Sequence, residues 1–334
     1  MIKIQDLKST FDNFINHNIL VIGDVMIDSY LWGKAERISP EAPVPVVSVK
    51  ERQQRLGGAA NVALNIQSLG ANPILCSVIG NDYKGNDFLQ ILADNNLSAE
   101  GIISSNERIT TTKYRIIANN YHMLRVDEEN DELLNKTDNE LLIDKIKDII
   151  STNQISAIIF EDYDKGVICE ESINTIVEFA NKKNIPTVVD PKKRNFAAYK
   201  NVTLFKPNLK ELKEGLKLDN IEVDIEMLSN ASEDLYAVLN NKYTLITLSE
   251  KGVFIRNNKT KQQQLIPAHI RNISDVSGAG DTVISVVALL IASGIDEFAT
   301  ASISNLAGGL VCEQVGVVSI NKELLFEEAE KNYR

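Results

Sequence analysis

Short apolar segments alternate with longer amphipathic segments along most of the chain. The apolar ones have the length expected of strands buried on both faces. They lie at 18–24, 72–80, 155–162, 185–191, 202–208 and 243–255. Between them, apolar residues recur with helical spacing, clearest at 5–16, 57–70, 84–95 and 137–150. Strands that alternate with helices predict an α/β fold with a doubly wound, mostly parallel sheet covered by helices on both faces.

Two extended segments interrupt this alternation and predict a separate small sheet. Residues 28–56 contain three prolines and alternate at 44–50, and residues 110–127 are rich in β-branched side chains. Prolines within an alternating segment are typical of edge strands, not of a central parallel strand. We expect about 28–55 and 108–127 to form a small β lid over one edge of the main sheet. The strand at 44–50 is apolar on both faces, and an apolar edge strand is normally covered by another part of the protein or by a partner. This predicts a homodimer through the lid.

Composition and charge exclude several classes of function. The 334 residues carry a formal net charge of −11, which argues against a nucleic-acid partner. The longest apolar run, 283–292, has about half of the ~20 residues needed to cross a bilayer, so no membrane partner is expected. Cys76, Cys169 and Cys312 fit no metal motif and no disulfide framework, and the N-terminus lacks signal-peptide features. These features predict a cytoplasmic protein.

The segment DVSGAGDTVIS, residues 275–285, carries the first chemical signal. The apolar run after it predicts a helix that begins within 278–281 and ends near Gly294. Free N–H groups at a helix N-terminus bind anions, and Gly278, Ala279 and Gly280 leave those groups open to a phosphate. A carboxylate beside such a site, here Asp281, can accept the proton of an attacking hydroxyl. Alone, the pattern also fits a plain loop in which Asp281 caps the helix.

Three further stretches, GGAANVALNIQSLG (57–70), KPNLKEL (206–212) and TLSEKGV (247–253), join DVSGAGDT in a recognisable order. Together they resemble the signatures of the ribokinase-like (PfkB) carbohydrate kinases over about residues 18–320. The resemblance implies a ribokinase-like fold that uses ATP and Mg²⁺ and forms one kinase domain over 1–334. It implies these roles: Asp281 as catalytic base, Gly57, Gly58 and Asn61 at the sugar, Asn208 and Glu211 at magnesium through water, and Ser249, Gly252 and Asn305 at the nucleotide. The Asn208/Glu211 pair also fits a helix-capping box, and both roles are compatible.

The stretch GDVMIDSYLWGKAERISPEAPVPVV (23–47) narrows the resemblance to D-glycero-β-D-manno-heptose-7-phosphate kinases of ADP-heptose synthesis. It implies phosphorylation of the C1 hydroxyl, with Asp24 and Asp28 accepting hydrogen bonds from the sugar. A 7-phosphate needs cations. The candidate cations lie in stretches that resemble stretches of the heptose kinases. Arg115, Lys165 and Lys192 are preferred over Arg37, Lys113 and Arg125. For each, a solvated face or a salt bridge is the competing explanation.

Some features depart from that subfamily and keep alternatives open. Glu161 and Asp164 stand where smaller residues are common, and no histidine belongs to an H-x-G-H motif. We therefore expect a stand-alone kinase without a nucleotidyltransferase domain. The alternatives are another kinase of this fold, acting on a sugar, a sugar phosphate or a nucleoside, and a non-catalytic sugar-phosphate sensor. A nicotinamide-dependent dehydrogenase is set aside, because no G-x-G-x-x-G follows the first strand.

Overall fold

A nine-stranded sheet runs through the computed structural model, which describes residues 4–119, 121–218, 223–269 and 273–333. Its strands are β1 (Asn18–Gly23), β4 (Asn72–Gly80), β5 (Gly101–Ser105), β8 (Ile155–Glu161), β9 (Thr187–Asp190), β10 (Leu204–Phe205), β11 (Tyr243–Thr247), β12 (Val253–Asn257) and β13 (Gln263–Ile266). The spatial order is β13-β12-β11-β10-β9-β8-β1-β4-β5. Neighbours from β5 to β11 pair in parallel, whereas β12 and β13 add an antiparallel edge.

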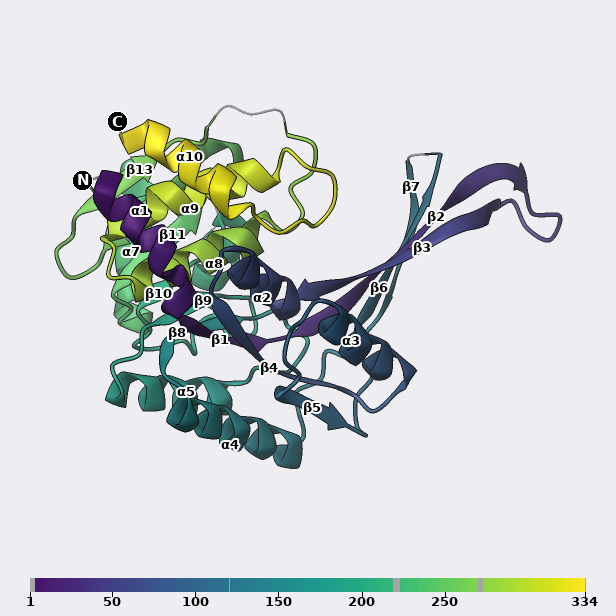
Figure 1. Cartoon of the computed structure of the whole chain (residues 1–334), viewed down its shortest axis with the longest axis horizontal. Coiled ribbons are helices and arrows are strands. Elements are labelled where there is room, and N and C mark those ends of the chain that lie inside the picture. The colour runs from purple at the N-terminus through teal and green to yellow at the C-terminus, as the bar shows by residue number, and fades with distance from the viewer. Residues whose placement is uncertain (1–3, 120, 219–222, 270–272, 334) are drawn as a thin grey trace.

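Helices cover both faces of this sheet (Figure 1). One face packs against α1 (Ile4–Asn13), α2 (Ala59–Ser68), α3 (Tyr83–Asp94), α8 (Ala279–Ala292), α9 (Glu297–Val311) and α10 (Lys322–Tyr333). The other face packs against α4 (Lys136–Thr152), α5 (Glu170–Lys182), α6 (Leu209–Leu216) and α7 (Ile225–Leu239). The doubly wound, mostly parallel α/β fold expected from the sequence is confirmed.

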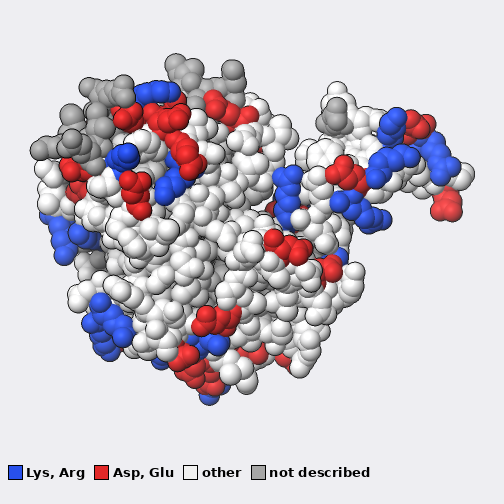
Figure 2. Space-filling model, in the orientation of Figure 1, with Lys and Arg blue, Asp and Glu red and all other residues white. Residues whose placement is uncertain are grey.

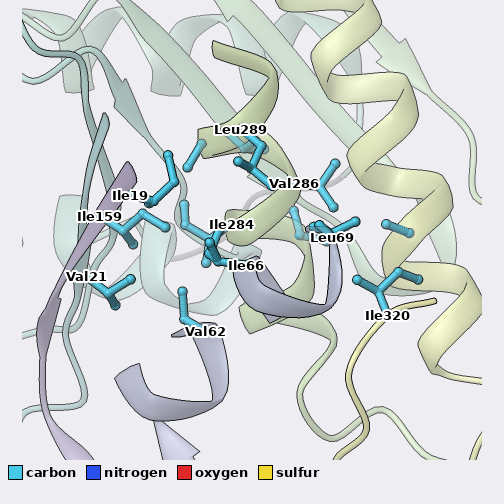
Figure 3. Close-up of a cluster of buried hydrophobic side chains, with 14 of the residues drawn as sticks. Ile19, Val21, Val62, Ile66, Leu69, Ile159, Ile284, Val286, Leu289 and Ile320 are labelled. Carbon is cyan, nitrogen blue, oxygen red and sulfur yellow. The ribbon is translucent and has the colours of Figure 1, made fainter. Parts of the chain in front are cut away.

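Strand β1 shows why its segment is apolar throughout. Ile19 and Val21 point into the core on the α8 face, and Leu20 and Ile22 point into the core on the opposite face. In Figure 3, residues of β1 and β8 lie beside Val62 and Ile66 of α2 and Ile284 of α8. Because alternate side chains of a strand point to opposite faces, only a continuous apolar run satisfies both cores. This packing fixes α2 and α8 side by side above the sheet.

Four further strands form a second sheet that projects from the main body (Figure 1). They are β2 (Val25–Ile38), β3 (Pro45–Gly58), β6 (Thr112–Ala118) and β7 (Tyr121–Glu128), in the order β3-β2-β6-β7. They come from the two segments expected to form the lid, although β2 begins three residues earlier than expected. Figure 2 shows basic residues gathered along this arm, where Lys34, Arg37, Lys50 and Arg52 are exposed. We call this sheet the small sheet.

The structure corrects several local expectations. The glycine pair at 57–58 ends strand β3, and the helix begins only at Ala59. Strand β5 and helix α10 were not anticipated, because their short or weakly periodic segments carry little pattern. The single helix expected between residues 208 and 243 is two helices, α6 and α7. Within the described residues, none of the helices combines the length and the apolar character needed to cross a membrane.

Candidate active site

Helix α8 begins at the glycine-rich segment, as expected from the sequence. Gly278 is the N-cap residue and has a left-handed φ of 80°, which glycine adopts at little cost. Residues 278–280 are half-buried, so this helix end remains accessible. The backbone N–H groups of Gly280 and Asp281 make no hydrogen bond within the described part of the chain. Two free amides and the positive end of the helix dipole therefore form a potential anion site.

Asp281 lies in the first turn of α8 but does not cap the helix. Its Oδ2 accepts a hydrogen bond from Asn61 Nδ2 at 2.6 Å, and its Oδ1 accepts one from the Tyr163 hydroxyl at 2.8 Å. Burial raises the pKa of Asp281 to about 6, although both hydrogen bonds act in the opposite direction. A carboxylate with a pKa near neutrality suits a general base. The competing explanation, in which Asp281 is only an N-cap, is wrong.

The glycine pair in GGAAN places Asn61 against Asp281. A Cβ atom on Gly57 would lie 2.8 Å from Asp28 Oδ2, and one on Gly58 would lie 2.3 Å from the backbone oxygen of Asp24. Gly58 also has a φ of 61°, which disfavours other residues. Only glycine lets β3 pass this close to β2 before turning into α2. Asn61 then lies in the first turn of α2 and reaches across to α8.

Asp24, predicted at the sugar, lies between β1 and β2 and anchors a loop. Its carboxylate accepts hydrogen bonds from the backbone N–H groups of Tyr163, Lys165 and Val167, at 2.8, 3.1 and 3.0 Å. Burial raises the pKa of Asp24 above its ordinary value, while these three hydrogen bonds partly offset the change. The anchored loop comprises residues 162–166, with the sequence DYDKG, so Asp24 fixes the backbone that carries Tyr163. Contact of Asp24 with a sugar stays a prediction.

The predicted phosphate-binding cations Arg115 and Lys165 both pair with carboxylates. Arg115 on β6 forms a salt bridge with the buried Asp28 of β2, and its guanidinium lies 5.3 Å from the ring centre of Tyr30. Lys165 pairs with Glu129 at 2.7 Å. Arg115 and Asp28 lie on neighbouring strands of the small sheet, whereas Glu129 follows β7 of the small sheet and Lys165 follows β8 of the main sheet. Each carboxylate orients its cation, and contact of Arg115 and Lys165 with a sugar phosphate stays a prediction.

Lys192, the third predicted cation for the sugar phosphate, contacts Glu211, one of the two predicted magnesium residues. Its Nζ lies 2.5 Å from Glu211 Oε1 and 5.4 Å from the ring centre of Tyr163. Burial opposes the charge, but Asp190 and Glu211 together raise the pKa of Lys192. Asn208 and Glu211 form the capping box of α6, with hydrogen bonds of 2.9 and 2.8 Å. The capping role is therefore present, as the sequence allowed.

The donor set around Glu211 fits magnesium only in part. Among the described residues, no group of three or more metal-ligating side chains is close enough to enclose an ion. Magnesium usually keeps several waters and is held by one or two carboxylates together with substrate phosphates. Glu211 and the amide of Asn208 fit that kind of open, water-mediated site.

Two of the three predicted nucleotide residues, Gly252 and Asn305, lie beside the chain at the end of β13. A Cβ atom on Gly252 would lie 2.0 Å from the backbone oxygen of Ile266, so only glycine fits there. Asn305 on α9 donates a hydrogen bond to the backbone oxygen of Pro267 at 2.9 Å. Ser249 begins the short helical turn before Gly252, with a φ of 54°. Gly252 and Asn305 thus contact one segment, Ser249 precedes Gly252 in its turn, and contact of the three with a nucleotide stays a prediction.

Four residues near Asp281 were not among the sequence-predicted site residues. Tyr163 binds Asp281 directly, and Lys206 forms a buried salt bridge with Asp190 at 2.7 Å. A Cβ atom on Gly280 would lie 3.6 Å from Asp190 Oδ2 and 3.8 Å from Lys206 Nζ. The fourth, Glu161, ends β8 beside Asp190. All four lie in or directly beside stretches already noted in the sequence, namely the apolar segments 155–162 and 185–191 and KPNLKEL (206–212). The stretches marked the region without indicating which side chains meet.

Comparisons with known proteins agree with this geometry. Residues 16–324 match the family described as "pfkB family carbohydrate kinase". The "Bifunctional protein HldE" of Geobacter sulfurreducens is 35% identical over 321 residues, covering 95% of this chain and 64% of that protein. The protein of the same name from Campylobacter jejuni strain RM1221 is 39% identical over 325 residues, covering 94% of this chain and 66% of that protein. This chain therefore spans about two thirds of the length of these relatives.

Solved structures share the fold at much lower sequence identity. Phosphofructokinase-2 from Escherichia coli, in complex with potassium, superposes with a TM-score of 0.76 at 17% identity, covering 95% of this chain and 99% of that chain. Ribokinase from Arabidopsis thaliana, complexed with ribose and ATP, superposes with a TM-score of 0.73 at 16% identity, covering 94% and 99%. The fold is therefore ribokinase-like.

Proposed function

Because this chain belongs to the pfkB family of carbohydrate kinases and is an ATP-dependent sugar kinase, we propose that its acceptor is D-glycero-D-manno-heptose 7-phosphate. The reaction transfers the γ-phosphoryl group of ATP to the C1 hydroxyl and yields the 1,7-bisphosphate, for ADP-heptose synthesis. The relatives named HldE are bifunctional by name, and the proposal concerns the kinase reaction alone.

One observation carries the chemical part of the proposal: a buried carboxylate lies in the same helical turn as two free amides. Asp281 accepts hydrogen bonds from Asn61 and Tyr163, which orient its carboxylate. The free N–H groups of Gly280 and Asp281 supply the positive field that a transferring phosphoryl group needs. A base and an anion site this close allow an acceptor hydroxyl to be deprotonated as the phosphoryl group arrives.

We assign each of these residues a role in the reaction. Asp281 takes the proton of the C1 hydroxyl, the hydroxyl oxygen forms a bond to the γ-phosphorus, and the bond from that phosphorus to the bridging oxygen of ADP breaks. The α8 amides stabilise the phosphoryl oxygens during the transfer. Glu211 and Asn208 hold magnesium through water, and magnesium when bound neutralises phosphate charge. Because Lys192 pairs with Glu211, we assign it a position beside the phosphates of the nucleotide.

Support for a phosphorylated heptose comes from the sequence of β2 and from the cations near it. The stretch 23–47 resembles heptose-7-phosphate kinases, and it forms the part of the small sheet that begins beside Asp24. Arg115 and Lys165 lie at the base of that sheet, each held by a carboxylate. We assign the 7-phosphate to these two cations, and we assign the sugar hydroxyls to Asp28 and Asn61.

A panel of acceptors tests the assignment. With ATP and Mg²⁺, kcat/KM for heptose 7-phosphate should exceed that for the unphosphorylated heptose by about 10–100-fold, the usual worth of one or two charge-assisted contacts. Arg115→Gln should remove much of this difference, while the exposed Arg52→Gln serves as a matched control on the same sheet. Faster turnover of fructose, ribose, a hexose phosphate or a nucleoside would instead assign the chain to another substrate class of the family.

The small sheet also supports a proposed homodimer. Its β7 strand exposes Tyr121, Leu124 and Val126, and its β3 strand exposes Val49. These strands are the two edges of the four-stranded sheet. Exposed apolar side chains on an edge strand favour a covering partner, and a second copy supplies one with matching shape. We therefore propose that two chains associate through their small sheets.

A further inference from the structure

Glu161 is the last residue of β8, a strand against which helix α8 packs. It pairs in register with Asp190 of β9 and with Gly23 of β1. Ile159, two residues earlier, faces the core that contains α8. Since side chains two residues apart share a face, Glu161 also points toward α8, as does Asp190. Helix α8 packs on both strands, and Asp190, the register neighbour of Glu161, lies beside Gly280 in the first turn of α8. The carboxyl of Glu161 therefore lies between the sheet and this helix, close enough to Asp281 to act on its charge.

One oxygen of this carboxyl group is buried without a hydrogen-bond partner among the described residues. Glu161 is 1% exposed, and its buried Oε2 atom makes no hydrogen bond within the described part of the chain. The cations nearby are already paired, Lys206 with Asp190 at 2.7 Å and Lys192 with Glu211. The remaining groups that act on Glu161 are the carboxylate of Asp281 and the phenol of Tyr163. Lys206 and Lys192 still favour a negative charge on Glu161, but each also serves another carboxylate, and the net effect of the surroundings is to oppose that charge.

Burial raises the pKa of Glu161 well above its ordinary value, and the carboxylates of Asp190 and Asp281 raise it further, while Lys206 and Lys192 offset only part of this rise. An isolated buried carboxyl group stays neutral, because the cost of desolvating its charge exceeds the cost of keeping its proton. A neutral Glu161 leaves the field of the α8 amides unchanged. An ionised Glu161 would place a negative charge beneath those amides and oppose an incoming phosphate.

We propose that Glu161 is a positioning residue that must keep its proton for phosphoryl transfer, because only the neutral carboxyl leaves the α8 anion site free to hold phosphate. The residue acts through α8 and needs no contact with the substrate. Ionisation of Glu161 should therefore lower activity at alkaline pH. This loss is separate from the loss at acidic pH, which is caused by protonation of Asp281.

The isosteric variant Glu161→Gln, which keeps the neutral state at every pH, tests the proposal in two ways. The first rests on the proposed function and measures kcat/KM from pH 6 to pH 10. The natural enzyme should lose on the order of tenfold or more as Glu161 ionises, whereas Glu161→Gln should keep its neutral-pH activity and lose less on the alkaline side. Superimposable alkaline limbs, or a correctly folded Glu161→Gln enzyme that is inactive at neutral pH, would overturn the proposal.

The second test needs no substrate and so separates failure of this proposal from failure of the acceptor assignment. Because the pKa of Glu161 is higher in the folded than in the unfolded chain, folded protein binds more protons between those two values, and stability falls as pH rises across that window. The melting temperature of the natural protein should therefore decline with pH relative to that of Glu161→Gln. Parallel curves would contradict the proposal.

Infrared difference spectra provide a direct check on the proton. At neutral pH, the natural protein minus Glu161→Gln should show the carbonyl stretch of a protonated carboxyl group, and absence of that band would contradict a neutral Glu161. Glu226→Gln, an exposed substitution on α7, is the matched control. It should show no such band and should melt with the same pH dependence as the natural protein.

Discussion

At the residue scale, the behaviour of Asp281 follows from competition between burial and hydrogen bonding. Removal from water raises its pKa, and the hydrogen bonds from Asn61 and Tyr163 lower it, with a net value of about 6. The same carboxylate at the surface would be ionised but weakly basic. Enclosure by α2 and by the loop of Tyr163 makes it a base that is both ionised at neutral pH and able to accept a proton.

Replacement of this base gives the first prediction. Asp281→Asn should lower kcat by about 10²–10⁴-fold, the usual contribution of general-base help, because an amide cannot accept the hydroxyl proton. ATP binding, measured by calorimetry, should be retained, since the α8 amides are unchanged. A variant that keeps normal turnover would show that Asp281 is not the base. A natural chain that binds ATP but shows no turnover with any acceptor would favour the sensor alternative.

The pKa of Asp281 gives a prediction for pH dependence. Activity should fall as pH drops through about 6, because protonation removes the base. Tyr163→Phe deletes a hydrogen bond that stabilises the carboxylate, so the acidic limb should move upward by about one pH unit. The measurement is kcat/KM from pH 4.5 to pH 8. Tyr114→Phe, which removes a phenol bonded to Glu128 on the small sheet, should leave the limb in place.

At the element scale, two glycines decide how a strand and a helix meet. Strand β3 ends at Gly57 and Gly58, and α2 starts immediately afterwards. The close contact of Gly58 with the backbone of Asp24 brings the start of α2 beside the end of β1. Backbone atoms cannot move aside as a flexible side chain does. The first turn of α2, with Asn61, is therefore fixed relative to Asp281.

A matched pair of glycine substitutions tests this. Gly58→Ala combines a positive φ with a Cβ atom 2.3 Å from a backbone oxygen, so it should destabilise the protein by about 2–4 kcal/mol and reduce activity. Gly294 also has a positive φ, 73°, but open space around it. Gly294→Ala should therefore cost only about 1 kcal/mol and leave activity intact. Chemical denaturation measures both; equal losses would mean that the contact with Asp24 contributes nothing.

At the scale of the whole molecule, the site forms where the small sheet meets the main sheet. Asp28 and Arg115 come from the small sheet, Asp281 and Asn61 come from helices on the main sheet, and the Tyr163 loop follows β8. The main sheet is covered on both faces, whereas the small sheet is exposed over much of its surface. Association of two small sheets would bury that surface and hold the sheet in one position above the site.

Sedimentation velocity tests this association. We expect the natural protein to be a dimer at micromolar concentration and Leu124→Glu to be a monomer, because the new charge would be buried at the interface. Leu141→Glu, an equally exposed leucine on α4, is the control and should remain dimeric. A natural protein that sediments as a monomer would remove the proposal, and dissociation of both variants would place the interface elsewhere.

Much of this architecture follows from local patterns in the sequence. Continuous apolar segments such as 18–24 predict strands buried on both faces, and amphipathic segments predict the helices between them. The start of α8 within 278–281 follows from glycines placed before an apolar run. Where the pattern is weak, as in the short polar strand β5 or in α10, the prediction fails, because periodicity reports burial only when burial is strong.

The sequence by itself determined the fold class, the family and the turn of α8 that carries Asp281, because each depends on residues that are neighbours along the chain. Tertiary structure alone decided that Tyr163 and Asn61 hold Asp281, that Lys192 pairs with Glu211, and that the buried Oε2 of Glu161 has no hydrogen-bond partner among the described residues. These contacts join residues far apart in sequence. Which of several nearby charges meet depends on how strands and helices pack, and no local spacing contains that information.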